Sequence, residues 1–410
     1  MKRLVVCCDG TWSRLDAKVP TNVVKLAANI APQDAAGVSQ IVYYDEGVGT
    51  YASELYRFGR LAEGAFGWGL DLHLEDAYRF LCLNYDAEDE IFVFGFSRGA
   101  FTARSLCGLI RKCGILRRDN IRQASKAIAV YRLRDEGADS EAATRFRAAN
   151  SRGKVSHKSV RDEIAGELKA HGIDNIDDAA KLVLAHDPNK VQIAYVGVWD
   201  TVGSLGVPNN WLLSRVLNER YRFHDPSLSS LVSSARHAIA IDEPRATFLD
   251  VPWDNLDKLN SVYGPLRVNG RDHQRYRQSW FPGDHGCVGG GTDISTPLSE
   301  ITLQWIADGA ALMGLTFLQR YASGWSTSTA YSIDFPRETG LVSNLLRLPG
   351  VKARSFVGTI SDVSDVAALR WQQRKDYRPG TLLNAACLGE STMNTAAAQR
   401  GLPKACDPAG

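Results

Sequence analysis

The stretch "IFVFGFSRGA", residues 91–100, decides the fold, because a run of buried-strand character leads directly into the start of a helix. Ser97 stands between Gly95 and Gly99 at this junction. In a strand–turn–helix context, Gly-x-Ser-x-Gly is typical of a tight turn that exposes a nucleophilic serine above a sheet. The alternative is a serine that only caps the helix beginning near Ala100. The context favours the nucleophile.

The strands expected around this junction are continuous apolar runs, as in a parallel sheet that is buried on both faces. They cover residues 3–9, 40–49, 90–96 and 191–200. Segments with helical spacing follow at residues 22–30, 71–85, 100–114 and 298–319. Strands that alternate with helices predict an α/β fold with a mostly parallel sheet flanked by helices.

The predicted domain organisation is one main domain over residues 1–320 with additions. A charged, Ala-rich helical insertion or cap is expected at about 116–190, and a second cap element at about 207–223. The apolar residues of the second cap include Trp211 and Leu212. Residues 321–410 are irregular in pattern and rich in Arg, Pro and Gly, and are expected to pack on the same domain.

Charge and cysteine usage narrow the class of protein. With 48 Lys and Arg against 46 Asp and Glu, the net charge of +2 predicts no general attraction to nucleic acid or to an anionic membrane. The eight cysteines have no C-x-x-C spacing and are expected to be reduced, mostly buried thiols. The sequence has no run of 18 apolar residues, so no transmembrane segment is predicted. The apolar run near the N-terminus is too short for a signal peptide, so we expect a cytoplasmic location or export without a cleaved signal.

A nucleophilic serine needs a histidine to take its proton and an acid to orient that histidine. In folds of this kind the acid and then the histidine follow the serine, each after a later strand. Asp200 fits the acid, because "VQIAYVGVWD" brings it to the carboxyl end of a buried strand. Asp242 and Asp250 are the alternatives.

Eight histidines compete for the role of base. Four of them precede the acid and so have the wrong order: His73, His157, His171 and His186. His224 and His273 lie in polar or charged loops. His237 is expected on a helix as a structural residue. His285, in "GDHGCVGGG", is flanked by glycines that let the backbone bend close to a ligand, and is assigned as the base.

The tetrahedral intermediate of such a reaction needs two backbone N–H donors. Arg98, the residue after the serine, is expected to supply one. The loop "CDGTW" at residues 8–12 is expected to supply the other from Thr11, with Gly10 letting the backbone expose its amides to the substrate. A plain turn at the end of a strand is the alternative reading of Asp9 and Gly10.

No cofactor or metal is expected from the motifs. Neither Gly-x-Gly-x-x-Gly after a strand nor the Walker phosphate loop is present, and no H-E-x-x-H or paired Cys/His spacing appears. A cation at Asp9, Asp45 and Glu46 is an alternative if their loops converge.

Seven blocks in this order resemble one known family. They are "VVCCDGTWSRLD", "YYDEGVGT", "LEDAYRFLCLNYDAEDEIFVFGFSRGAFTARSLCGLI", "VGVWDTVGSLGVP", "RYRFHDPSLS", "ARHAIAIDEPRATF" and "SWFPGDHGCVGGG". Together they resemble an α/β-hydrolase family long labelled a bacterial domain of unknown function, which includes type VI secretion phospholipase effectors. The resemblance covers roughly residues 1–320. It implies an α/β-hydrolase fold with Ser97 as nucleophile, Asp200 as acid and His285 as base.

The resemblance also implies a substrate class and partners. It implies a serine hydrolase of carboxylic esters, in particular a phospholipase or lipase. In such an enzyme the segment with Trp211 and Leu212 is expected to be the acyl-side cap, and Gly10 is expected to help bind the substrate. An immunity protein or a part of the secretion apparatus would be the partner. One departure is the pair Gly286 and Cys287, where the family pattern has Ser-Asp. A soluble hydrolase of small esters or thioesters and a non-catalytic binding or assembly module are the alternatives.

Overall fold

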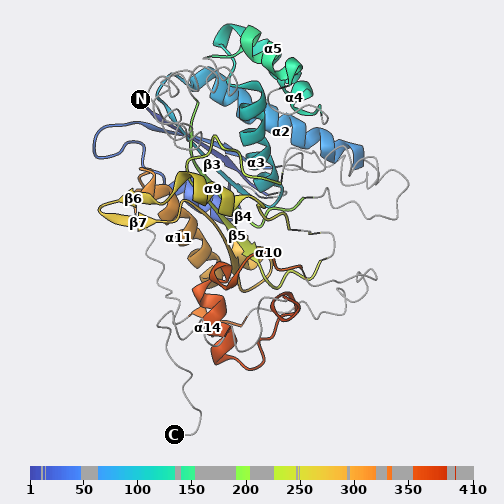
Figure 1. Ribbon diagram of the computed structural model, residues 1–410, viewed down its shortest axis with the longest axis vertical. Coiled ribbons are helices and arrows are strands. Elements are labelled where there is room, and N and C mark those ends of the chain that lie inside the picture. Colours follow the sequence, from blue (N-terminus) through green and yellow to red (C-terminus); the bar gives the residue numbers. More distant parts are fainter. Residues whose placement is uncertain are drawn as a thin grey trace, which may run out of the picture.

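The structure is a computed structural model of the chain. It describes residues 1–10, 13, 15–47, 63–133, 140–152, 191–203, 226–245, 248, 250–292, 296–319, 330–334, 354–385 and 393, with only the backbone of 63–68 and 296. A six-stranded parallel sheet in the order β2-β1-β3-β4-β5-β8 forms its centre (Figure 1). The prediction of an α/β fold with a mostly parallel sheet flanked by helices is confirmed.

The strands of this sheet are β1 (Arg3–Cys8), β2 (Gln40–Asp45), β3 (Glu90–Phe96), β4 (Ile193–Trp199), β5 (Ala235–Ala240) and β8 (Tyr276–Phe281). The short strands β6 (Leu266–Val268) and β7 (Arg271–His273) form a separate hairpin. The helices that precede the C-terminal segment are α1 (Asn22–Asn29), α2 (Glu63–Asn84), α3 (Arg98–Cys113), η2 (Arg118–Gln123), α4 (Ala124–Tyr131), α5 (Glu141–Asn150), α9 (Leu256–Tyr263), α10 (His285–Gly289) and α11 (Thr296–Leu312).

Both faces of the sheet are buried, as the continuous apolar runs predict. On β1, Leu4 and Val6 belong to the core shared with α2 and α3, whereas Val5 and Cys7 belong to the core shared with α1 and α11. Figure 1 shows α4 and α5 stacked outside α2 and α3. These two helices lie within the predicted insertion. Its remaining residues 153–190, and the second cap at 207–223, lie outside the described residues.

The expectation of a helix around His237 is wrong, because His237 lies in the middle of β5. The segment mixes polar and apolar residues, and Arg236 and His237 are both buried in the sheet. Arg236 is accommodated because its guanidinium stacks on the ring of Trp305, 5.2 Å away. Pairing with β4 and β8 therefore overrides the local pattern.

The two glycines beside Ser97 allow the turn between β3 and α3 to pack directly on the end of β1. A Cβ on Gly99 would lie 2.2 Å from the carbonyl oxygen of Cys8. A Cβ on Gly95 would lie 2.5 Å from the carbonyl oxygen of Gly99. Since these contacts are to backbone atoms, a larger residue at Gly99 would push α3 away from β1, and one at Gly95 would push α3 away from β3.

The C-terminal segment, residues 354–385, packs against β5 and β8. It contains η3 (Ile360–Asp362), α14 (Asp365–Gln373) and α15 (Gly380–Leu383). Part of the region with an irregular sequence pattern is therefore helical. Trp280 of β8 joins a core cluster with Val363 and Trp371. Its indole N–H donates to the carbonyl oxygen of Val357 (3.1 Å). These contacts attach the segment to the last strand of the sheet.

Candidate active site

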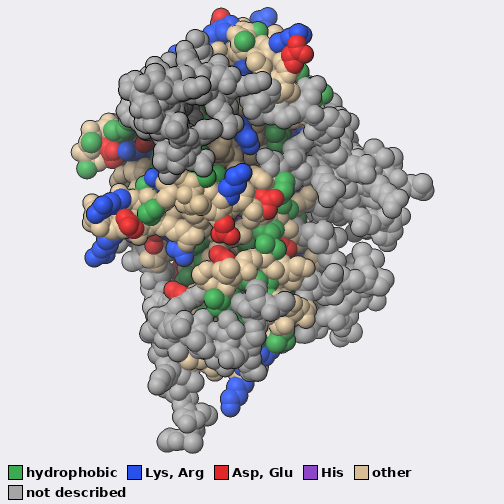
Figure 2. Space-filling view, viewed as in Figure 1, with side chains coloured by type: hydrophobic (Ala, Val, Ile, Leu, Met, Phe, Trp, Pro, Cys, Tyr) green, Lys and Arg blue, Asp and Glu red, His purple; other side chains and the backbone are tan. Residues whose placement is uncertain are grey.

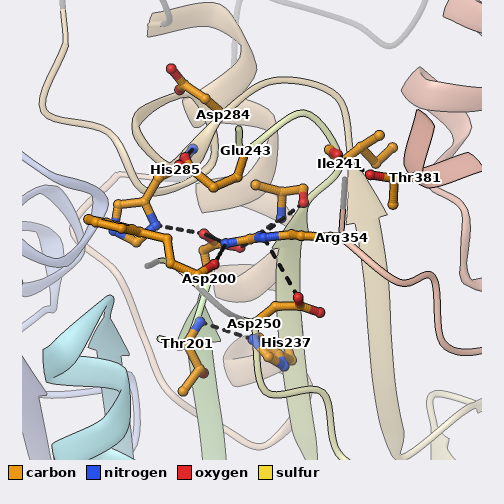
Figure 3. A network of polar contacts seen from close by, with 12 residues as sticks. Asp200, Thr201, His237, Ile241, Glu243, Asp250, Asp284, His285, Arg354 and Thr381 are labelled. Carbon is orange, nitrogen blue, oxygen red and sulfur yellow. Dashed lines mark hydrogen bonds and ion pairs between the residues drawn. The ribbon is translucent and has the colours of Figure 1, made fainter. Parts of the chain in front are cut away.

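The candidate site residues lie at the carboxyl edge of the sheet, where open α/β sheets place their ligands. Ser97 follows β3, Asp200 follows β4, and His285 comes four residues after the end of β8, as the first residue of α10. Figure 3 shows Asp200 and His285 pointing toward each other. The topology therefore brings together side chains that are far apart in the sequence.

Ser97 adopts a backbone conformation that is unusual for any residue with a side chain. Its φ is 57° and its ψ is −122°, and the residue is only 6% exposed. Its backbone N–H donates to the carbonyl oxygen of Trp199 (3.1 Å). Its side chain makes no cap hydrogen bond to α3. A capping role thus does not explain the serine, and backbone strain of this kind gathers at functional sites.

Asp200 and His285 make a short, fully buried contact. The Nδ1 atom of His285 lies 2.6 Å from Oδ2 of Asp200, whose exposed fraction is zero. The backbone N–H of Ala240 donates to the other oxygen, Oδ1 (2.8 Å). Asp200 also has a positive φ, of 38°. With Nδ1 engaged by the carboxylate, the Nε2 atom of the imidazole is left to act on a substrate or nucleophile.

Arg354, which nothing in the local sequence marks, is a third partner of this pair. Its Nη1 donates to Oδ1 of Asp200 (2.6 Å) and its Nη2 donates to Oδ2 (3.0 Å). Burial by itself would raise the pKa of the Asp200 carboxyl, but Arg354 and His285 together hold that pKa well below its usual range. The Arg354 cation and His285 therefore favour the ionised form of Asp200.

Two phenylalanines and a glutamate fix the position of His285. The rings of Phe96 and Phe248 lie 4.5 Å and 4.9 Å from the imidazole, measured between centroids. The backbone N–H of His285 donates to Oε2 of Glu243 (3.1 Å). Glu243 is itself held by the side chain of Arg245. Because Phe96 directly precedes Ser97, its contact also places the serine turn beside the imidazole.

The two alternative acids have other partners. Asp242 accepts hydrogen bonds from the backbone N–H of Gly283 (2.7 Å) and the hydroxyl of Tyr377 (2.9 Å). Asp250 lies 3.7 Å from Nε of Arg354, and burial raises its pKa to about 6 despite that cation. Asp200 is the carboxylate that the structure joins to His285.

The residues expected to bind the oxyanion are only partly described. Arg98 is the first residue of α3, and burial lowers the pKa of its guanidinium to about 10. Gly10 lies beside the serine, since a Cβ on it would be 3.4 Å from Cβ of Ser97. Its own N–H donates to Oδ1 of Asp9 (2.6 Å). Thr11, like Trp211 and Leu212, lies outside the described residues.

The acidic residues near β1 and β2 are engaged in separate pairs. Asp9 accepts from the hydroxyls of Thr21 (2.6 Å) and Tyr44 (2.8 Å), whereas Asp45 contacts Nδ1 of His73 (2.6 Å). Over the described part of the chain, no three His, Cys, Asp or Glu side chains group as metal ligands would. The alternative of a cation site here gains no support from these contacts.

The departure from the family pattern falls inside α10. Gly286 and Cys287 are its second and third residues, and the carboxylate of Asp284 accepts from the backbone N–H of Cys287 (2.8 Å) as the helix cap. Burial raises the pKa of the Cys287 thiol well above its usual range. An acid therefore precedes His285 where the family has one after it.

His237 is a second buried histidine among the described residues, and from its surroundings we expect stability to depend on pH. Its Nε2 accepts from the backbone N–H of Thr201 (3.3 Å), while burial and the nearby Arg104 hold its pKa well below the usual 6.5. Below pH 6.5 the unfolded chain therefore binds a proton that the folded protein does not. We expect the free energy of unfolding to fall by about 1.4 kcal/mol per pH unit below that point.

Urea denaturation of the wild type and His237→Gln at pH 7, 6 and 5 measures this effect. The glutamine can still accept from Thr201 but does not titrate, so the variant should lose this part of the slope. Asp250, whose pKa is raised, acts in the opposite direction between pH 6 and 4, but it is common to both proteins and cancels in their difference. Identical slopes for the two proteins would contradict the prediction.

Comparison with known proteins identifies the family to which the chain belongs. A family model described as T6SS, phospholipase effector Tle1-like, catalytic domain matches residues 2–309, which is more than half of the chain. The uncharacterized protein YEL023C of Saccharomyces cerevisiae is 26% identical over 274 residues, 64% of this chain and 34% of that protein. A crystal structure of an uncharacterized protein from Pseudomonas aeruginosa aligns with a TM-score of 0.38 and 16% identity, over 77% of this chain and 46% of that chain. The chain thus spans less than half the length of either relative. By the extent of the family match, it belongs to the family of Tle1-like catalytic domains of type VI secretion phospholipase effectors.

Proposed function

We propose that the protein is a serine hydrolase that cleaves carboxylic esters of phospholipids, with Ser97 as nucleophile, His285 as general base and Asp200 as the acid that orients it. Membership of the family supports a hydrolase of the phospholipase or esterase type. The observation that carries the finer proposal is the 2.6 Å contact of Asp200 with His285, whose ring packs against Phe96, the residue before Ser97.

In the first half of the reaction, Oγ of Ser97 attacks the ester carbonyl while Nε2 of His285 takes the hydroxyl proton. Asp200 stabilises the imidazolium that forms. The protonated His285 then gives this proton to the leaving alkoxide, which departs as the alcohol. An acyl ester on Ser97 remains.

In the second half, water attacks this acyl ester, and His285 again takes and returns one proton. The carboxylic acid leaves and Ser97 regains its hydroxyl. The net change is one ester and one water converted into one acid and one alcohol. The backbone N–H of Arg98 would donate to the oxyanion in both halves, because it follows the nucleophile at the N-terminus of α3.

The charge distribution on the described surface favours selection of the substrate by contacts within the site, rather than by attraction to a surface of one charge. Figure 2 shows Lys and Arg side chains interspersed with Asp and Glu over the described part of this face. None of the helices within the described ranges is long and apolar enough to cross a bilayer. An acyl chain is the part of a phospholipid that a site lined by Phe96 and Phe248 would hold. The effector family points to an immunity protein and secretion apparatus as partners.

The test is a hydrolysis panel with the wild type and Ser97→Ala. The panel contains p-nitrophenyl esters of increasing acyl length, a diacyl phospholipid and its lyso form. We expect fatty acid release from phospholipid by the wild type and none above background by the variant. Cleavage of only the shortest esters would favour a small-ester hydrolase. Equal rates for both proteins would contradict the proposal.

A further inference from the structure

We propose that Arg354 is a positioning residue of this hydrolase, which holds the carboxylate of Asp200 so that Oδ2 meets Nδ1 of His285. The inference rests on the proposed function and deepens it. Arg354 lies beyond residues 2–309, the part of the chain that the family model matches. The site would therefore depend on a residue from outside the matched catalytic domain.

The contacts of Arg354 form a complete clamp. Its two terminal nitrogens donate one hydrogen bond to each oxygen of Asp200. They also donate to the carbonyl oxygens of Ala240 (3.0 Å) and Phe248 (2.9 Å). Arg354 is 6% exposed and Asp200 is fully buried. A fork that grips both oxygens while anchored to two backbone carbonyls fixes the plane of the carboxylate as well as its position.

The geometry shows what the clamp adds. Without Arg354, Oδ1 of Asp200 would keep the backbone N–H of Ala240, and Oδ2 would keep His285. With one contact on each oxygen instead of two, the carboxylate would be held less firmly against rotation about its Cβ–Cγ bond. A base that is misplaced by about 1 Å can cost about 100-fold in rate, so loss of the clamp should reduce turnover more than substrate binding.

Arg354 also sets the electrostatics of the base. The charged and titratable groups that face Asp200, His285 and Arg354 are Asp250, Glu243, Arg245, His237 and Arg104. The Arg354 cation offsets part of the negative charge of Asp200. Its removal would leave the charge of Asp200 without that offset beside the base, so hydrolysis would need a higher pH. An apolar replacement should therefore shift the acid side of the pH profile upward.

The C-terminal segment is what holds Arg354 at the site. Within this segment, the Tyr377 hydroxyl donates to Asp242 (2.9 Å) and the Thr381 hydroxyl donates to the carbonyl oxygen of Ile241 (2.8 Å). Both acceptors lie in the loop after β5, one or two residues from Ala240, which Arg354 also contacts. Figure 3 shows Thr381 and Arg354 approaching the site from the same side.

The experiment compares Arg354→Lys and Arg354→Met with the wild type by kcat, KM and the pH profile of kcat/KM. Arg354→Lys keeps the charge but loses the fork, so we expect kcat to fall about 10-fold with unchanged KM and an unshifted profile. Arg354→Met loses both, so we expect about a 100-fold fall in kcat and an acid limb that lies at higher pH. Arg374→Met is the matched control, since Arg374 lies in the same segment and pairs with Asp334 and Asp376.

A purely structural role gives a different result. Both Arg354 variants would then lower the thermal midpoint, while the molecules that remain folded, measured by circular dichroism, would keep the wild-type kcat and acid limb. That result would overturn the inference. If Arg354→Met does not fold, the inference is tested by Arg354→Lys alone, through the expected fall in kcat at constant KM. A wild type with no Ser97-dependent hydrolysis would remove the proposed function and this inference with it. Ser97-dependent hydrolysis that both variants retain in full would remove the inference only.

Discussion

Asp200→Asn is expected to lower the rate of ester hydrolysis about 10,000-fold. The asparagine has the shape of the aspartate, but one of its two positions is an NH₂ donor with no charge. It would no longer hold the Nδ1 proton of His285 or stabilise the imidazolium that forms during attack. The imidazole would then be held in the wrong tautomer and could not act as a base.

The same substitution should destabilise the fold, because Arg354 would remain buried opposite a neutral side chain. Breaking a buried ion pair by removing one partner costs about 3 to 5 kcal/mol. The measurements are kcat/KM on the best ester of the panel and the urea midpoint of the variant. A loss of activity of less than tenfold in folded protein would remove Asp200 from the triad.

Asp89→Asn is the matched control for these measurements. Asp89 is also buried, and its carboxylate accepts from the ammonium group of Lys2 (2.6 Å). It precedes β3 and so lies at the amino edge of the sheet, opposite the site. We expect Asp89→Asn to lower stability while leaving the rate per folded molecule unchanged, which separates the two effects of Asp200→Asn.

Ser97→Ala and Ser97→Gly are both expected to lower hydrolysis about a million-fold, since neither has a nucleophile. Their stabilities should differ. Ser97 and its alanine replacement must both adopt φ 57° and ψ −122° with a Cβ atom, at a cost of about 1 to 3 kcal/mol. Glycine reaches this conformation without that strain but loses about 0.5 to 1 kcal/mol through its freer unfolded chain.

We therefore expect Ser97→Gly to be about 1 kcal/mol more stable than Ser97→Ala, measured by urea denaturation of the two inactive proteins. The comparison isolates backbone strain, because the hydroxyl is absent from both. A glycine variant no more stable than the alanine variant would mean that the strain in the turn does not exceed the entropic cost of glycine. Residual hydrolysis above one part in a thousand in either variant would point to another nucleophile.

The sequence predicted strands β1, β2, β3 and β4 but not β5 and β8. β1, β3 and β4 are buried on both faces, so they carry uninterrupted apolar runs. β5 and β8 contain Arg236, His237 and Gln278, which are acceptable in a buried strand only because of tertiary partners such as Trp305 and Trp253. Such partners leave no trace in a local pattern.

The residues of the candidate site could also be predicted only in part. Ser97, Asp200 and His285 could be proposed because each follows a recognisable strand or lies among glycines. Glu243 and Arg354 could not, since their roles arise from contacts that no spacing reveals. Arg354 stands in "VKARSF", which reads as an ordinary basic stretch. Only the packing of the C-terminal segment brings it to Asp200.

The separation along the sequence between Asp200 and its partners affects how the chain folds. His285 is 85 positions away and Arg354 is 154 positions away. Parallel strands cannot pair through hairpins, so every strand contact in this sheet closes a long loop. Chains dominated by such distant contacts fold slowly, because the entropy of closing each loop is lost before the contact forms. Helices rest on local contacts and can form early, whereas the clamp on Asp200 can close only when the C-terminal segment docks, so we expect the candidate site to be among the last parts of the fold to be completed.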